Sequence, residues 1–146
     1  MWGSQVAEPL YNAELLRLAA ATADFTRLDA PGASSAQRSP ICGSRIIVDV
    51  ALDDAGRISA VGMEVRACIL GQASAALMAA NAIGKDGATL GAARDTLKDF
   101  LDGKRSDPGI WPGLTALAPA QPHSARHGAI MLAFDAVSAA THAAAR

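Results

Sequence analysis

The sequence has few aromatic residues, almost no net charge and no long apolar run. Aromatic residues make up 4% of the 146 residues, whereas about half of the chain is apolar, much of it alanine. This composition favours closely packed helices over an aromatic-lined cleft for a large flat cofactor. A formal net charge of −1 gives no basic field for nucleic acid. No apolar run reaches the roughly 20 residues of a membrane-spanning helix, so we expect no membrane partner.

The length of the chain, its first residues and its two cysteines indicate the number of domains, the cellular location and the roles open to the thiols. A chain of this length can bury one hydrophobic core but not two comfortable ones, so we predict a single domain over residues 1–146. The stretch from Met1 to Gln5 lacks the basic and apolar regions of a signal peptide, and we expect a cytoplasmic location. Cys42 and Cys68 could pair, but in a reducing compartment two thiols more often bind metal, react or are simply buried.

The middle of the sequence predicts an antiparallel hairpin. Residues 45–52 are rich in β-branched side chains, residues 53–56 (Asp-Asp-Ala-Gly) supply turn chemistry, and residues 57–67 alternate again between apolar and polar. Turn-forming residues dominate residues 29–40, which predicts a loop with a short edge strand before Pro40. These segments predict a small antiparallel sheet of three strands.

The remaining segments predict helices. Asn12 can cap a first helix that runs to about Ala23, with Glu14 in its first turn and Tyr11 packing on Leu16. The order α, β, β and then a run of helices, the last of them long, predicts an α+β fold. The later elements are a helix over 69–83, a helix over 89–101, a short helical piece from Trp111, a break over 119–122, and a last helix from the cap Ser124 to about His142.

The two cysteines occupy related places in this hairpin. Cys42 lies just before the first strand and Cys68 ends the second, so antiparallel pairing should bring both sulfurs to one edge of the sheet. Cys68 also begins a predicted helix, whose free N–H groups favour the thiolate that binds metal or attacks sulfur. Each cysteine could equally be a small buried apolar residue. Their convergence at one rim favours a functional site.

Three stretches of the sequence resemble one known family. They are residues 40–43 (Pro-Ile-Cys-Gly), the hairpin with Asp53, Asp54 and Gly56, and residues 67–78 (Ala-Cys-Ile-Leu-Gly-Gln-Ala-Ser-Ala-Ala-Leu-Met). They closely resemble the U-type iron-sulfur cluster assembly scaffolds, namely IscU, SufU and the N-terminal domain of NifU, with the same spacing between the two cysteines. Arg126 and residues 132–136 (Leu-Ala-Phe-Asp-Ala) resemble that family's final helix. The resemblance implies the SufE/NifU-like fold.

The chain departs from the family pattern at two ligand positions. The family site uses three cysteines and an aspartate, of which Cys42 and Cys68 carry over. Ser44 occupies the place of the aspartate, and Ala129 the place of the third cysteine. The segment by which IscU-type proteins engage their chaperone is absent from the neighbourhood of residues 117–123. The resemblance therefore implies a scaffold with an incomplete ligand set.

Two residues near the missing cysteine are candidates for the site. His127 is a candidate ligand for iron or zinc, because imidazole binds both metals. A histidine near a helix start is more often solvated or hydrogen-bonded. Arg126 aligns with an arginine of the SufU-like branch and could offset thiolate charge, or it could be a solvated residue. His123, in the preceding loop, is a weaker candidate, and His142 is expected at the surface.

The resemblance implies a carrier and not an enzyme. The cargo would be iron or an iron-sulfur cluster of the 2Fe–2S type, with zinc as another occupant. The implied partners are a cysteine desulfurase and apo-proteins that accept the cluster. A homodimer in which each chain gives Cys42 and Cys68 would supply four thiolates. Two alternatives stay open: a SufE-like persulfide acceptor or desulfurase activator without a cluster, and a domain that holds zinc or no metal and serves as an interaction surface.

Overall fold

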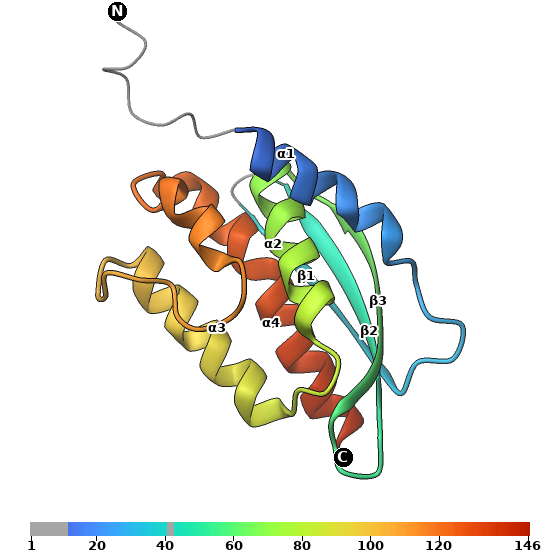
Figure 1. Ribbon diagram of the computed structural model, residues 1–146. Helices are drawn as coiled ribbons and strands as arrows, with labels where there is room; N and C mark the ends of the chain where they lie inside the picture. The colour runs from blue at the N-terminus through green and yellow to red at the C-terminus, as the bar shows by residue number, and fades with distance from the viewer. Residues whose placement is uncertain (1–11, 41–42) are drawn as a thin grey trace, which may run out of the picture.

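A three-stranded antiparallel sheet forms one layer of the molecule (Figure 1). The computed structural model describes residues 12–40 and 43–146. The strands are β1 (Ala33–Arg38), β2 (Arg45–Leu52) and β3 (Ile58–Arg66), with β2 in the centre. The turn between β2 and β3 closes with a 2.8 Å bond from the Asp53 N–H to the Arg57 carbonyl. The predicted hairpin and the predicted short edge strand are both confirmed.

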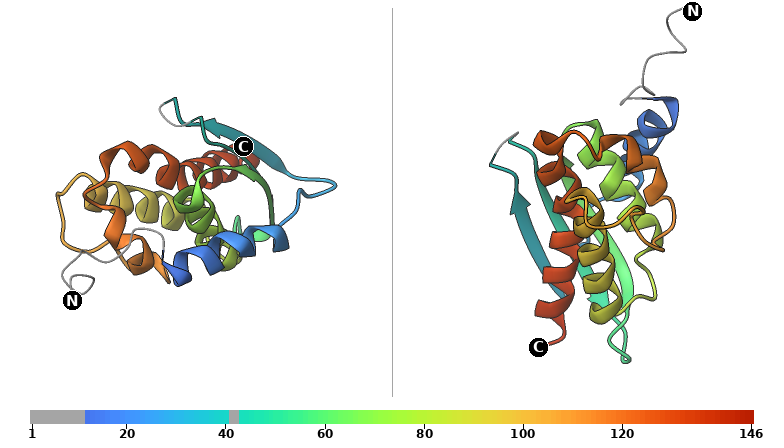
Figure 2. Two further views of the ribbon diagram at one scale, coloured as in Figure 1. Left: turned by 90° about the horizontal axis from the view of Figure 1, so that it is seen from above. Right: turned by 90° about the vertical axis from the view of Figure 1, so that its left-hand side faces the viewer.

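The helices gather on one face of this sheet, and the two views in Figure 2 show α4 lying between the sheet and α3. None of the helices in the described part of the chain is both long and apolar enough to cross a membrane. The predicted α+β architecture is confirmed, including the N-terminal helix and the long C-terminal one. The helices are α1 (Ala13–Ala20), α2 (Ile69–Asn81), α3 (Gly87–Leu101) and α4 (His127–Ala144), with short 3-10 helices at Ala21–Asp24, Leu114–Ala120 and Ser124–Arg126.

The core lies between the sheet and helices α2 and α4. Alternate residues of β2, namely Ile46, Val48 and Val50, are at most 2% exposed and face the helices, as period-two alternation requires. Most of α2 is buried on all sides, which its run of alanines permits because small side chains let helices approach closely. The predicted apolar stripe of the last helix is buried as well: Ile130, Met131, Phe134 and Val137.

Side-chain caps set the starts of two helices. Asn12 caps α1 as predicted, since its side-chain oxygen accepts the Leu15 N–H at 3.0 Å. Its proposed partner in a hydrophobic staple, Tyr11, lies outside the described residues. Asp86 caps α3 by accepting the Thr89 N–H at 2.9 Å, so this helix begins at Gly87, two residues earlier than predicted. An aspartate at the N-cap was the signal for that earlier start.

Four details of the predicted helices differ from the structure. The first helix tightens into a 3-10 turn after Ala20, and α2 stops at Asn81 because the chain turns toward Gly84, where φ is +86°. Pro119 does not break its helical segment, because the 3-10 helix runs on to Ala120. Ser124 makes no side-chain cap and instead opens a 3-10 turn ahead of α4.

The opposite, outer face of the sheet carries a buried carboxylate. Asp49 in β2 is 0% exposed, and its oxygens accept hydrogen bonds from Arg27 Nε at 2.6 Å, the Leu28 N–H at 2.9 Å and Ser34 Oγ at 2.5 Å. Burial alone would raise the pKa of Asp49, but these hydrogen bonds outweigh it and hold that pKa below its ordinary value. The network fixes the loop between α1 and β1 against the sheet.

A glycine makes the close approach of that loop possible. Gly62 of β3 pairs directly with Asp49 across the sheet. A Cβ added at Gly62 would collide with the carbonyl oxygen of Thr26 and would stand 2.9 Å from the Leu28 nitrogen. Only a residue without a side chain lets the loop lie on this part of the outer face.

Candidate functional site

Cys68 stands where β3 passes into α2. It is the N-cap residue of α2, half-buried, and its thiol is not part of a disulfide. The Gln72 side chain donates to the Ala67 carbonyl at 2.8 Å and ties the first turn of the helix back to the end of the strand. The change from strand to helix therefore falls at Cys68, as the sequence predicted.

The loop between β1 and β2 stands at the same end of the sheet. Ser39 and Ser44 close it through a 2.8 Å bond from the Ser39 N–H to the Ser44 carbonyl, and Gly43 adopts a φ of +74°. Cys42 and Ile41 lie outside the described residues. The strand register nevertheless places the two ends of this loop beside Arg66, two residues before Cys68.

The first turn of α4 packs at this same end of the sheet, against the first turn of α2 and the end of β1. A Cβ at Gly71, in the first turn of α2, would stand 3.3 Å from the Ala129 carbonyl oxygen, and one at Gly128 would stand 3.0 Å from Ser39 Oγ. Ser74 Oγ donates to the Ile130 carbonyl at 2.7 Å. The position of the family's third cysteine thus lies against the helix that begins at Cys68, but Ala129 is 1% exposed and offers no donor.

His127 is held by backbone groups. Its Nε2 lies 2.8 Å from the Gln121 carbonyl and 3.1 Å from the Ala120 carbonyl, so Nε2 carries a proton and donates. Nδ1 is then the one ring nitrogen with a lone pair for a metal. Arg126, next to it, is the half-buried N-cap residue of α4. His123 and His142 are exposed.

The described residues do not complete a four-ligand site. Among residues 12–40 and 43–146, no three or more His, Cys, Asp and Glu side chains lie close enough together to hold a metal ion. Ser44 is 3% exposed and packs into the loop closure, where the family pattern has a carboxylate. Iron in a cluster and zinc ordinarily take four donors. Cys68 needs donors from elsewhere to hold either one.

Three arginines that the sequence reasoning missed line up at this end of the sheet. Arg38, Arg45 and Arg66 are directly opposite one another across β1, β2 and β3. All three are exposed, on the outer face. The signal was available, because a hairpin register that pairs the start of the strand at 45 with the end of the strand near 66 brings two of them together.

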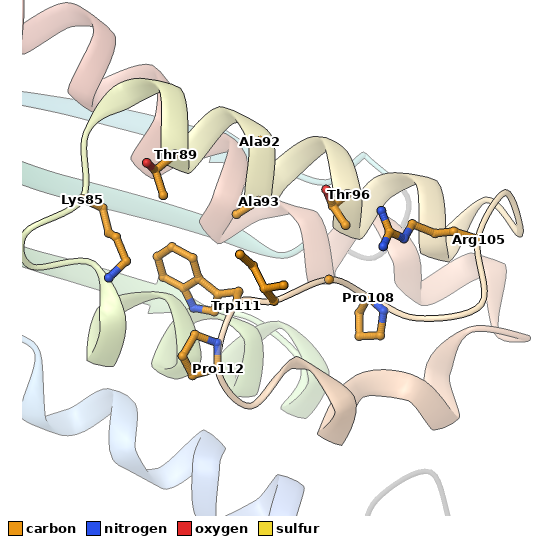
Figure 3. A pocket seen from close by; sticks show the side chains of 11 residues that line it. Lys85, Thr89, Ala92, Ala93, Thr96, Arg105, Pro108, Trp111 and Pro112 are labelled. Carbon is orange, nitrogen blue, oxygen red and sulfur yellow. The ribbon is translucent and has the colours of Figure 1, made fainter.

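A pocket of about 650 Å³ lies elsewhere, between α3 and the loop before the 3-10 helix (Figure 3). Trp111 forms its floor, with its indole N–H donating to the Leu77 carbonyl at 2.9 Å and Lys85 Nζ 5.9 Å from its ring centre. Leu77 is nine residues along α2 from Cys68, roughly 13 Å of helix rise. Arg105 marks the other end of the pocket, whose lining contains no cysteine, histidine or carboxylate.

Comparison with known proteins identifies the fold and the family. No protein-family model matches the sequence, and no curated protein does. The crystal structure of a nitrogen-fixing NifU-like protein (N-terminal) from Brucella abortus matches with a TM-score of 0.85 and 32% identity, over 93% of this chain and 94% of that one.

Two further solved structures share the fold at lower identity. A protein from Fervidobacterium islandicum assigned as an iron-sulfur cluster assembly scaffold for the SUF system matches with a TM-score of 0.82 and 16% identity, over 90% and 96% of the two chains. A hypothetical protein matches with a TM-score of 0.63 and 22% identity, over 86% and 97%. The identity and coverage of the Brucella match show that this chain belongs to the NifU-like N-terminal domain family.

Proposed function

We propose that this chain is an iron-sulfur cluster scaffold or carrier that binds iron or a cluster through Cys42 and Cys68. One observation supports this proposal above the others. Cys68 and both ends of the loop that contains Cys42 stand at one end of the sheet, next to the start of α4. Family membership makes that end of the fold the expected place for the cargo. The chain would bind and release the cargo and would turn over no substrate.

Two cysteines per chain are too few to fill the coordination of the cargo, so other donors are needed. Two thiolates per chain leave two positions open on iron in a cluster or on zinc. His127 Nδ1 is one candidate donor, because Nε2 donates its proton to the Gln121 and Ala120 carbonyls and the neutral ring then has its lone pair on Nδ1. A second chain that contributes its own Cys42 and Cys68 would complete four thiolates. Cluster loading should then be accompanied by dimer formation.

A second candidate function is sulfur relay, and the structure around Ala129 favours it. A buried alanine stands where a third thiolate would be needed for a one-chain cluster site. In a relay, the Cys68 thiolate attacks the outer sulfur of a desulfurase persulfide. The new S–S bond forms on Cys68 as the bond to the desulfurase sulfur breaks, and the desulfurase leaves as a thiolate. No external oxidant or reductant is required.

Anaerobic reconstitution separates the two functions. The native chain is mixed with iron and sulfide and followed by visible absorbance, metal analysis and sedimentation, beside Cys42→Ser, Cys68→Ser and the exposed control His142→Ala. A scaffold gives a chromophore that both cysteine variants lose and that His142→Ala retains. A colourless, iron-free native protein contradicts the scaffold proposal, and zinc in its place would identify a zinc-binding domain.

Incubation with a cysteine desulfurase and cysteine tests the relay. Intact-mass analysis of the native chain should then show one added sulfur atom, which Cys68→Ser abolishes and Cys42→Ser retains. A mass increase without a chromophore would favour the relay. Absence of both signals would leave an interaction domain.

Restoring the third thiol tests the importance of Ala129. The variant Ala129→Cys should raise the iron content retained per chain after desalting, because it adds a donor beside the first turn of α2. Ala129→Ser is the matched control, since it has similar volume but a poorer ligand for iron. Equal iron retention in the two variants would show that position 129 does not reach the cargo.

A further inference from the structure

Arg38, Arg45 and Arg66 form a row across the three strands, called the arginine row below. Direct cross-strand partners point to the same side of a sheet, about 5 Å apart between neighbouring strands. The three guanidinium groups therefore share one patch on the outer face, with Arg66 68% exposed. Like charges that lie directly opposite destabilise a sheet. The fold retains this unfavourable arrangement in a chain whose net charge is −1.

The charge of the row is not neutralised by its surroundings. On the same face, Glu64 lies 3.8 Å from Arg66 Nε, and the Arg27–Asp49 pair balances itself. The six charged groups therefore sum to +2. Within the described part of the chain, the side chains of Arg38 and Arg45 make no hydrogen bond or ion pair. This local excess of positive charge can attract an anionic group from outside the chain, most strongly at low salt.

The patch also has the shape to receive such a counterpart. A hollow of about 290 Å³ lies beside two of the three arginines, and Arg66 is not part of its lining. The lining residues are Ala36, Gln37, Arg38, Arg45, Ile46 and Ile47. The helices lie against the other face of the sheet, so they do not cover the patch (Figure 2). Each arginine offers a planar fork that binds a carboxylate through two hydrogen bonds. Alternate carboxylates of one extended segment lie roughly 7 Å apart, within reach of long arginine side chains on strands about 5 Å apart.

We propose that the arginine row is a docking surface for an acidic, extended segment of a partner protein. The arginines lie at the end of the sheet next to Cys68 (the cysteine end). Arg38 directly precedes Ser39, Arg45 directly follows Ser44, and Arg66 is two residues before Cys68. A partner held there lies beside Cys68, whatever cargo or sulfur species that cysteine handles. Nucleic acid is a poor fit, because three clustered arginines on a chain of negative net charge give no extended basic track.

Fluorescence anisotropy with a labelled hexaglutamate peptide tests the surface. The native chain should bind the peptide at about 50 mM salt and lose it as salt rises, because exposed pairs are screened. Each single change to glutamine in the row should weaken binding about 2- to 5-fold, and the triple change by more than 10-fold. Arg57→Gln is the matched control, since it removes the same charge from an exposed position at the opposite end of the hairpin.

Several outcomes would overturn the proposal. Equal weakening by Arg57→Gln would show a general charge effect, and unchanged binding in the triple variant would place the peptide elsewhere. A short DNA oligonucleotide or inorganic phosphate that displaces the peptide at equal charge concentration would identify a non-selective anion site. Circular dichroism of each variant confirms that it is folded, so loss of binding cannot be a loss of structure.

Discussion

Two rows of residues on the outer face of the sheet differ in whether their charges are paired. In the row of Ser34, Asp49 and Gly62, the loop after α1 covers Asp49 and Gly62, and the one charge is matched by Arg27 and a backbone N–H. The arginine row, four residues earlier in β2, places three like charges side by side on the exposed surface. The charge of the first row is paired within the chain, whereas the charges of the second row are exposed to solvent.

The difference separates a structural role from a recognition role. A buried charge is tolerated only when it is paired and hydrogen-bonded, so Asp49 is tied to the loop that covers it. Exposed charges of one sign gain nothing from the fold and cost it a little. We therefore expect changes in the first row to alter stability, and changes in the arginine row to alter binding. Four measurements test this division, in order of decreasing effect.

The largest effect should come from Asp49→Asn. The change leaves Arg27 without its counter-charge and turns an amide N–H₂ toward donors. Removal of one partner of a buried pair costs about 3 to 5 kcal/mol. Because Arg27 is 43% exposed and can turn to water, we expect the lower end, about 3 kcal/mol, by urea unfolding. The control Asp54→Asn removes an exposed turn carboxylate and should change little; equal effects would refute a special role for Asp49.

The next effect should come from Gly62→Ala. A methyl group there pushes the Thr26–Leu28 segment off the sheet, and overpacking of this kind typically costs about 1 to 3 kcal/mol. Gly91→Ala is the control, because its Cβ meets no atom within 4 Å and alanine favours a helix. The thermal midpoint should fall for Gly62→Ala and stay level or rise for Gly91→Ala. A rise for both would mean that the loop shifts freely.

Low pH should reduce the contribution of Asp49 to the stability of the fold. Since the pKa of Asp49 is lower in the folded than in the unfolded chain, its contribution to stability is complete above the unfolded value of about 4 and is lost as pH falls through the folded value. The difference in unfolding free energy between the native chain and Asp49→Asn should therefore shrink below about pH 4. A difference that stays constant down to pH 2 would contradict this assignment.

The smallest effect should come from Arg45→Gln. Arg45 has a like charge on each side, so its removal relieves repulsion and should raise the free energy of unfolding by at most about 0.5 kcal/mol, less at high salt. Arg57→Gln removes a charge that lies near the Asp86 carboxylate and not near another arginine, so it should not raise the free energy of unfolding at low salt. Destabilisation of Arg45→Gln by more than about 1 kcal/mol would show that the arginine row has a structural role.

The sequence predicted most of the fold because its local signals agree with one another. β-branched residues in 45–52, the turn at 53–56 and the small-residue helix after Cys68 all specify the same hairpin-to-helix unit, and the structure has it. The misplaced boundaries fall where tertiary packing overrides local preference. Pro119 was expected to break the chain, but the segment around it stays helical as the 3-10 helix Leu114–Ala120, the kind of short piece that often connects longer elements.

The site was less predictable than the fold. The place of Cys68 followed from period changes in the sequence, but the hydrogen bonds of His127 to the 120–121 carbonyls depend on a loop whose path carries no local pattern. The Arg27–Asp49 pair joins positions 22 residues apart through a loop crossing that the sequence does not encode locally. Only a pairwise register would have found the arginine row.

Three chain segments meet at the end of the sheet next to Cys68, so the cargo proposed to bind there would be linked to the folding equilibrium. Residues near 40, near 68 and near 129 are brought together only when the whole chain is folded, so an unfolded chain disperses them. Anything that binds at their junction must therefore shift the equilibrium toward the native state, by an amount that grows with the logarithm of its concentration over its dissociation constant. By the same linkage, a partner that loosens α4 from α2 would lower the affinity of this junction for the proposed cargo without touching a ligand.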